Sequence, residues 1–229
     1  MTTPFQYRSE CAEHVIIGSG DLHGALSVPR DASGVVIFAY RSGKEGEISL
    51  ENSMSAYIAD GLYRNKIATI LVDLLTVDER SDAYNQRDMA LLASRFFSVT
   101  EWVTSVPHIS QLPCGYFGIG KDAGAAILAA SGPDQRIRAI AAHNGRVDMA
   151  GPAALSRIRA PVQLIVGSRD LSAVGISQAS MVHMQCQKEL ITLSEAEYAH
   201  GELAMAGQIV KHAARWFLSH FAAAGYASA

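Results

Sequence analysis

The sequence CGYFGIGKDAGAAI at residues 114–127 decides how the rest of the chain is interpreted. Residues 114–119 form an apolar run that suits a buried strand, and the small residues from Asp122 onward suit a helix lying close to a sheet. Gly120 stands at the centre of the turn between them, and no serine, cysteine or threonine occupies that turn. The stretch therefore predicts a strand that runs through a tight turn into a helix, without a hydroxyl or thiol at the turn.

Outward from this turn, apolar runs that suit strands alternate with stretches of helical spacing in both directions. The predicted strands are residues 13–17, 22–28, 35–39, 67–73, 114–119, 137–142, 161–166 and 189–193. The predicted helices are one that begins near residue 49 and those over 86–104, 122–131, 173–187 and 201–221. This alternation predicts an α/β fold, with a mostly parallel central sheet of about eight strands and helices on both faces.

The composition suits one large domain with a sizeable core, because 49% of the 229 residues are hydrophobic and only 18% are charged. We find no internal repeat, low-complexity tract or linker, so residues 1–229 are predicted to form a single domain. The net charge of −3 and the lack of a basic cluster argue against binding to nucleic acid or to an anionic membrane. We expect a small-molecule ligand or substrate, and the sequence leaves a homodimer open.

The cysteines and the first residues bear on the compartment. Cys11, Cys114 and Cys186 are an odd number without C-x-x-C spacing, which favours reduced thiols over a disulfide framework or a zinc site. The N-terminal residues lack a basic region followed by an apolar run, so no signal peptide is predicted. No apolar run approaches the roughly 18–20 residues of a membrane span. We therefore expect a cytoplasmic protein without a metal.

Two loops after this turn carry an acid and then a histidine, which continues the order nucleophile, acid, histidine of a catalytic triad. Asp170 follows the predicted strand 161–166, and His200 follows the strand 189–193 immediately before the last helix. A carboxylate at Asp170 would orient the imidazole of His200, which would accept a proton from a nucleophile or from water. Asp170 and His200 are therefore the predicted catalytic residues.

Over nearly its full length the chain resembles the dienelactone-hydrolase-like branch of the α/β-hydrolase superfamily. The segments that carry the resemblance are LSVP (26–29), 34–39, LVDLLT (71–76), 112–118, RAPVQLIVGSRD (159–170) and Ala199-His200. The run R-A-P-x-x-L-I-V-G-x-x-D before the acid is its most characteristic part. The resemblance implies a three-layer α/β-hydrolase fold, hydrolysis of a small ester, lactone or related acyl compound, and no metal or organic cofactor.

The turn around Gly120, which corresponds to the nucleophile elbow of α/β-hydrolases, departs from the family's pattern. The motif G-x-S-x-G falls on Gly118 to Asp122, so that Gly120 takes the place of the nucleophilic serine and Asp122 that of the closing glycine. Lys121, between them, is predicted to lie in the substrate-binding region. These changes predict a degenerate catalytic triad.

The loop that helps to hold the oxyanion departs as well. The family's H-G-x-G falls on Tyr40, Arg41, Ser42 and Gly43, so Tyr40 and Arg41 replace the histidine and the first glycine. Losing one donor of an oxyanion hole typically costs about 10²–10³ in turnover. Tyr40, Arg41 and Ser42 are therefore predicted near the substrate, in a loop altered together with the elbow.

Three functional hypotheses stay open. His200 and Asp170 could activate water without a covalent nucleophile, or the protein could be a pseudoenzyme that binds a small molecule or a protein partner. In the third, Gly120-Lys121-Asp122-Ala123-Gly124 is read as G-x-D-x-G, the motif of epoxide and haloalkane hydrolases, and Asp122 is the nucleophile. The helix dipole offers Asp122 a structural role instead.

Overall fold

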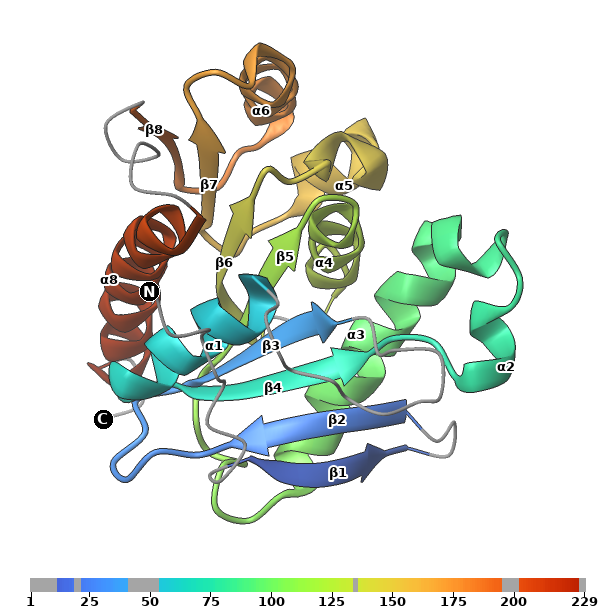
Figure 1. The fold of residues 1–229 in the computed structure, drawn as a ribbon, viewed down its shortest axis with the longest axis vertical. Coiled ribbons are helices and arrows are strands. Elements are labelled where there is room, and N and C mark those ends of the chain that lie inside the picture. Colours follow the sequence, from blue (N-terminus) through green and yellow to red (C-terminus); the bar gives the residue numbers. More distant parts are fainter. Residues whose placement is uncertain (1–11, 19–21, 41–53, 134–135, 195–201, 227–229) are drawn as a thin grey trace, which may run out of the picture.

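The computed structural model describes residues 12–18, 22–40, 54–133, 136–194 and 202–226, with the side chains of 202–203 and 224–226 left aside. Its strands are β1 (Glu13–Ile17), β2 (Leu22–Ser27), β3 (Val35–Tyr40), β4 (Ala68–Asp73), β5 (Cys114–Ile119), β6 (Ile137–His143), β7 (Val162–Gly167) and β8 (Lys188–Leu193). They form one sheet in the order β1-β2-β4-β3-β5-β6-β7-β8 (Figure 1). β2 runs antiparallel to both of its neighbours, and every other pair is parallel. The predicted eight-stranded, mostly parallel sheet is confirmed.

The central strands are buried on both faces, as their continuous apolar runs predict. In β3, β4 and β7 all positions except Ala39 are buried, whereas most positions of the edge strand β8 are partly or fully exposed. The helices are α1 (Met54–Arg64), α2 (Val77–Arg80), η2 (Asn85–Arg87), α3 (Met89–Ser105), α4 (Asp122–Ala130), η3 (Val147–Ala150), α5 (Pro152–Arg157), α6 (Leu171–His183) and α8 (Glu202–Tyr226).

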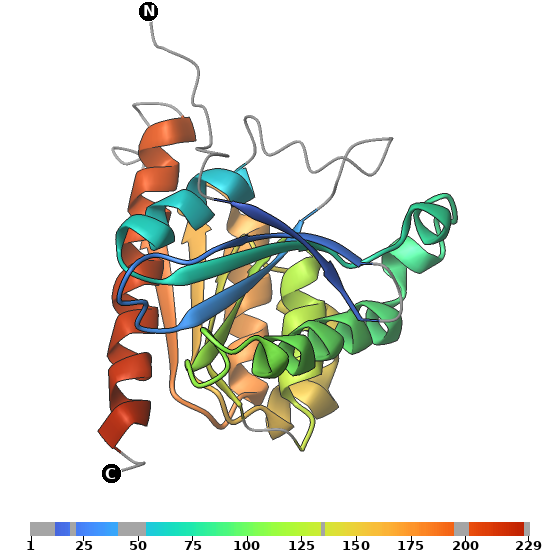
Figure 2. The same cartoon turned by 90° about the horizontal axis from the view of Figure 1, so that it is seen from below.

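Helices cover both faces of the sheet and divide the core in two. α1 and α8 pack on one face, with side chains such as Ile58 and Phe217, while α3, α4 and α5 pack on the other with side chains such as Phe96 and Ile127. Figure 2 shows these two layers on opposite sides of the twisted sheet. The three-layer arrangement agrees with the prediction.

Some helix boundaries differ from the predicted ones for local reasons. α3 begins at Met89 rather than at residue 86, because the carboxylate of Asp88 caps it by accepting from the backbone N–H groups of Ala90 and Leu91. α6 ends at His183 rather than at residue 187, because Met184 turns into an extended conformation and is buried. The short helices α2 and α5 were not predicted. The predicted helix start near residue 49 lies outside the described residues.

The connectivity of the sheet predicts where a ligand binds. After β3 the chain moves to β4 on one side, and it later returns to β5 on the other side of β3. In parallel α/β sheets ligands bind outside the carboxyl ends of the strands where the order reverses in this way. Tyr40 and Ile119 end these two strands, so the switch point lies beside the Gly120 turn. Among the described helices, none has both the length and the apolar composition needed to cross a bilayer.

Candidate active site at the carboxyl ends of the strands

Gly120 forms the turn between β5 and α4 and has a φ of +57°, in the left-handed region. Its N–H donates to the carbonyl of His143 at 3.3 Å, and its own carbonyl accepts from the N–H of Arg146 at 2.7 Å. A Cβ added at Gly120 would meet no atom within 4 Å. Glycine adopts this φ without the cost that other residues incur. The turn therefore has room for a side chain but carries none.

Three neighbouring glycines let α4 lie close to the ends of β5 and β6. An added Cβ at Gly118 would stand 2.4 Å from the Cα of Ala123, and one at Gly145 would stand 2.7 Å from the Cβ of Ala123. At Gly124 the same atom would stand 2.8 Å from the carbonyl oxygen of Arg146. Side chains at these positions would push the helix away, so the glycines hold the first turn of α4 against the strand ends.

The first turn of α4 retains a hydrogen-bond donor next to the elbow. The backbone N–H of Lys121 has no acceptor within the part of the chain that the structure describes. In α/β-hydrolases the N–H of the residue after the nucleophile is one of the two donors that hold the oxyanion. Asp122 lies in the same turn, and its carboxylate pairs with the Lys121 ammonium at 3.2 Å. The backbone therefore keeps an N–H group without a described acceptor in the turn that follows Gly120.

The ends of β3 and β4 form the other wall of the site. Tyr40 pairs in register with Asp73, and both are buried. Burial, and after it the negative charge of Asp73, raise the pKa of the Tyr40 phenol above its ordinary 10.0, so the phenol stays protonated at neutral pH. Arg41 and Ser42, predicted beside Tyr40, lie outside the described residues.

A buried ion pair that sequence reasoning missed holds this wall in place. Asp73 pairs with Arg80 of α2 at 2.9 Å and accepts from the N–H of Leu75 at 3.1 Å. The side chains of Asp73 and Arg80 are only 6% and 18% exposed. The sequence did hold a signal for this ion pair. Asp73 is a carboxylate at the end of an apolar strand, and such a group is rarely buried without a partner.

Asp170 follows β7 and caps α6, accepting from the N–H of Ala173 at 2.9 Å. Its side chain lies at the same edge of the sheet as Gly120, because β5 and β7 are parallel. His200, its predicted partner, lies outside the described residues, so the contact between these two residues stays a prediction.

His143 ends β6 directly beside the elbow, in register with Ile119. It is 5% exposed, and its Nδ1 lies 3.3 Å from the carbonyl oxygen of Ile165. Burial lowers its pKa below the ordinary 6.5, so the imidazole is neutral at pH 7. Because a carbonyl only accepts, Nδ1 carries the proton of this neutral ring.

The described residues contain no group of three histidine, cysteine, aspartate or glutamate side chains placed to hold a metal ion. Cys114 is buried and Cys186 half-buried, while Cys11 lies outside the described residues.

Comparison with known proteins places the chain among hydrolase-fold proteins. No family model matches it. It is 36% identical over 211 residues to a protein of Mycobacterium tuberculosis, strain H37Rv, and to its counterpart in strain CDC 1551, both named "Putative phosphoribosyl transferase". The match covers 92% of this chain but 46% of those proteins, so the chain spans about half of their length.

Solved structures match over the full fold. The dienelactone hydrolase of Anabaena variabilis is 32% identical, with a TM-score of 0.79 over 91% of this chain and 96% of that one. A serine hydrolase homologue from Coxiella burnetii (18% identical, TM-score 0.68, 88% and 96% covered) and Est1E from Butyrivibrio proteoclasticus (12%, 0.68, 92% and 99%) share the fold.

Proposed function

The chain belongs to the dienelactone hydrolase family of the α/β-hydrolase fold, and on this premise we propose that it binds a small acyl compound at the elbow without forming a covalent bond to it. The compound is an ester or a lactone, the class that membership of the family implies. The transferase named for the M. tuberculosis proteins is not part of the proposal, because the chain spans only 46% of their length.

The observation that carries the proposal is the backbone of Gly120. Covalent catalysis of acyl transfer needs a nucleophilic side chain at the turn, and the left-handed residue that follows β5 is a glycine. The nearby N–H of Lys121 would still donate to the carbonyl oxygen of a bound ester or lactone, as it would to an oxyanion. The site therefore keeps a means of orienting the ligand and lacks the atom that would attack it.

The position of Asp122 supports a structural role for its carboxylate rather than nucleophilic attack. Asp122 is the first residue of α4, two residues after the left-handed Gly120, and its carboxylate is paired with the ammonium of Lys121. A carboxylate in the first turn interacts favourably with the helix dipole. We infer that Asp122 stabilises the start of α4.

Hydrolysis by activated water is the second candidate function. It is favoured by the acid that the loop after β7 still carries at Asp170, exposed and at the carboxyl edge of the sheet. In this mechanism His200 would take a proton from water as the water attacks the carbonyl carbon, and Asp170 would stabilise the imidazolium. His200→Ala would then abolish turnover and leave binding of the ester.

The test of binding without covalent attachment combines two measurements on the wild-type protein. A panel of short esters and lactones is expected to contain a compound that raises the melting temperature in a saturable way, because a ligand that binds only the folded state stabilises it. A serine-directed fluorophosphonate is expected to leave no adduct detectable by mass spectrometry. An adduct on the elbow, or an acyl-enzyme trapped with a panel ester, contradicts the proposal, as does a panel without any stabilising compound.

A further inference from the structure

The helix α6 is inverted relative to an ordinary surface helix. Its two buried side chains are polar, Ser177 and Ser180, which are only 1% and 3% exposed. Leu171 and Val182, which lie near its two ends, are 78% and 76% exposed. A surface helix normally turns its apolar side chains toward the core and its polar ones toward water. The outer face of α6 therefore presents apolar area that the fold of one chain does not bury.

The outer face of α6 also lacks charged side chains. No aspartate, glutamate, lysine or arginine occurs among the 13 residues of the helix. Successive helix residues are about 100° apart, so Leu171, Gly175 and Val182 share one face, with Gln178 and Ala179 at its sides. All five of these residues are exposed. The centres of protein–protein interfaces are depleted of charge in the same way. The face therefore has the composition of a contact surface.

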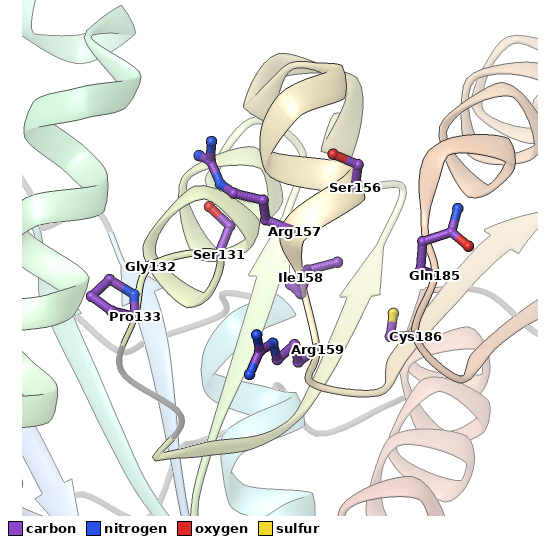
Figure 3. A pocket seen from close by; sticks show the side chains of 9 residues that line it. All are labelled: Ser131, Gly132, Pro133, Ser156, Arg157, Ile158, Arg159, Gln185 and Cys186. Carbon is purple, nitrogen blue, oxygen red and sulfur yellow. The ribbon is translucent and has the colours of Figure 1, made fainter.

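A cavity of about 940 Å³ next to the C-terminal end of α6 does not account for this face (Figure 3). Its two exposed arginines, Arg157 and Arg159, lie on either side of Ser131 and do not converge on one point. Ile158 is only 2% exposed, and Gln185 beside it is polar and exposed, so the lining has no apolar end. The exposed apolar residues of α6 therefore need a different partner.

The order of side chains along the outer face is self-complementary. Leu171 and Val182 stand at its ends, and the small residues Gly175 and Ala179 lie between them. If two copies of α6 pack antiparallel, the register that sets Leu171 against Val182 of the second copy also sets Gly175 against Ala179 to within one residue. A Cβ added at Gly175 would meet no atom within 4 Å, so the space over it is open in one chain. A two-fold axis that uses the same patch twice produces this pairing.

The two ends of α6 carry opposite charges, which match in the same antiparallel arrangement. The exposed carboxylate of Asp170 caps the N-terminal end. At the other end the Lys188 ammonium donates to the carbonyl oxygens of Met181 and Met184 at 2.8 and 2.6 Å, and its third N–H remains for an acceptor. Antiparallel packing brings the Asp170 end of one copy to the Lys188 end of the other, and it also sets the two helix dipoles in opposite directions. Arg169, next to Asp170, already has an interaction of its own.

We propose that the outer face of α6 is the interface of a homodimer, in which two copies of α6 pack antiparallel across a two-fold axis. With 13 residues the helix is about 20 Å long. A contact of that length falls at the small end of specific interfaces, below about 1,200 Å², where complexes are weak and reversible. We therefore expect a monomer–dimer equilibrium. The proposal does not depend on the chemistry at Gly120.

Sedimentation equilibrium of the full chain, from about 1 µM to about 1 mM, tests this interface. The wild type is expected to pass from monomer to dimer in that range. Val182→Lys is expected to weaken the dimer by about tenfold or more, because it places a charge in the apolar contact, while a cation near the C-terminal end suits the helix itself. Ile16→Lys is the matched control, at a 57% exposed isoleucine on β1, at the edge of the sheet opposite to β8. It is expected to dimerise as the wild type does.

Gly175→Gln tests the contact without adding a charge. Its side chain has open space in one chain, so the monomer is expected to keep its fold, but it would hold the second helix away and weaken the dimer by about tenfold. A wild type that stays monomeric throughout overturns the proposal and leaves the face to a different partner. A dimer that neither Val182→Lys nor Gly175→Gln weakens overturns it too, as does one that Ile16→Lys weakens equally. Circular dichroism checks the fold of each variant.

Discussion

Gly120 is the residue on which the proposed function depends. Its left-handed φ and the open space at its Cβ are the features that a nucleophile at a sharp turn requires, yet glycine has no atom with which to attack. Under the proposed function, glycine at this turn leaves the site without a nucleophilic side chain, and it avoids the backbone cost that any other residue would bear there. The two effects act in opposite directions on function and on stability.

Gly120→Ser is therefore expected to lower the free energy of unfolding by about 1–2 kcal/mol, the cost of a left-handed conformation for a residue with a Cβ. It is also expected to create labelling by a fluorophosphonate, because the serine would stand beside the N–H of Lys121, which has no acceptor among the described residues, with the predicted base His200 to accept its proton. Denaturant titration and mass spectrometry measure the two effects.

Gly18→Ser is the matched control, since Gly18 also has a left-handed φ and open space at its Cβ but lies in the β1–β2 hairpin. It should show the same loss of stability without labelling. A Gly120→Ser protein as stable as the wild type would refute the left-handed turn, and one that stays unlabelled would refute the preserved site.

The buried His143 leads to a prediction about how the free energy of unfolding depends on pH. Burial lowers its folded-state pKa below the unfolded value of about 6.5, so the unfolded chain binds the proton more readily. The stability that its neutral form contributes is complete above pH 6.5 and is lost as the pH falls below it. Unfolding free energies measured at pH 7.5 and pH 5 are expected to differ less in His143→Asn, whose amide can still donate to Ile165, than in the wild type.

His183→Asn, at an exposed histidine of α6, provides the comparison and should keep the wild-type difference between the two pH values. If His143→Asn and His183→Asn show the same pH dependence, the neutral buried imidazole beside the elbow is refuted.

At the scale of the element, α4 shows how close packing builds a site. Its alanines and glycines contribute little apolar area each, but they let the helix approach β5 until backbone atoms touch. Gly118→Ala is expected to destabilise the fold by about 1–3 kcal/mol, because the new methyl group would meet the backbone of Ala123 at 2.4 Å. Chemical denaturation gives the value.

Gly175→Ala tests the same substitution at a position where the added methyl group has open space. Gly175 lies inside α6 and a Cβ there would meet no atom within 4 Å, so alanine is expected to stabilise the protein by about 0.5–1 kcal/mol. Changes of the same sign in both variants would show that the approach of α4 is not limited by Gly118.

At the scale of the whole molecule, one sheet joins the two core layers. Phe96 packs on one face and Phe217 on the other, both fully buried, and every strand between them belongs to the same sheet. We predict a single cooperative unfolding transition, with equal calorimetric and van't Hoff enthalpies. Phe96→Ala and Phe217→Ala are each expected to cost about 3–5 kcal/mol and to lower that one transition. Two transitions that respond separately to the two variants would contradict the single domain.

Much of this fold follows from local pattern. Continuous apolar runs predicted central strands such as β3, β4 and β7 within a residue or two, because a strand buried on both faces has to be apolar throughout. The capped start of α3 and the early end of α6 escaped prediction, since they depend on one carboxylate at Asp88 and on the burial of Met184. The Asp73–Arg80 pair escaped it as well, because its partners meet only when α2 folds over the end of β4.

The sequence by itself determined that the chain alternates strands and helices and that no serine, cysteine or threonine stands in the turn after residue 119. Only the tertiary structure decided that Gly120, and not Asp122, takes the left-handed conformation at the turn, that Tyr40 and Asp73 meet beside it, and that His143 is neutral. The physical reason is that backbone strain, burial and the pairing of charges depend on neighbours distant in sequence. Residue types and their spacing do not specify those neighbours.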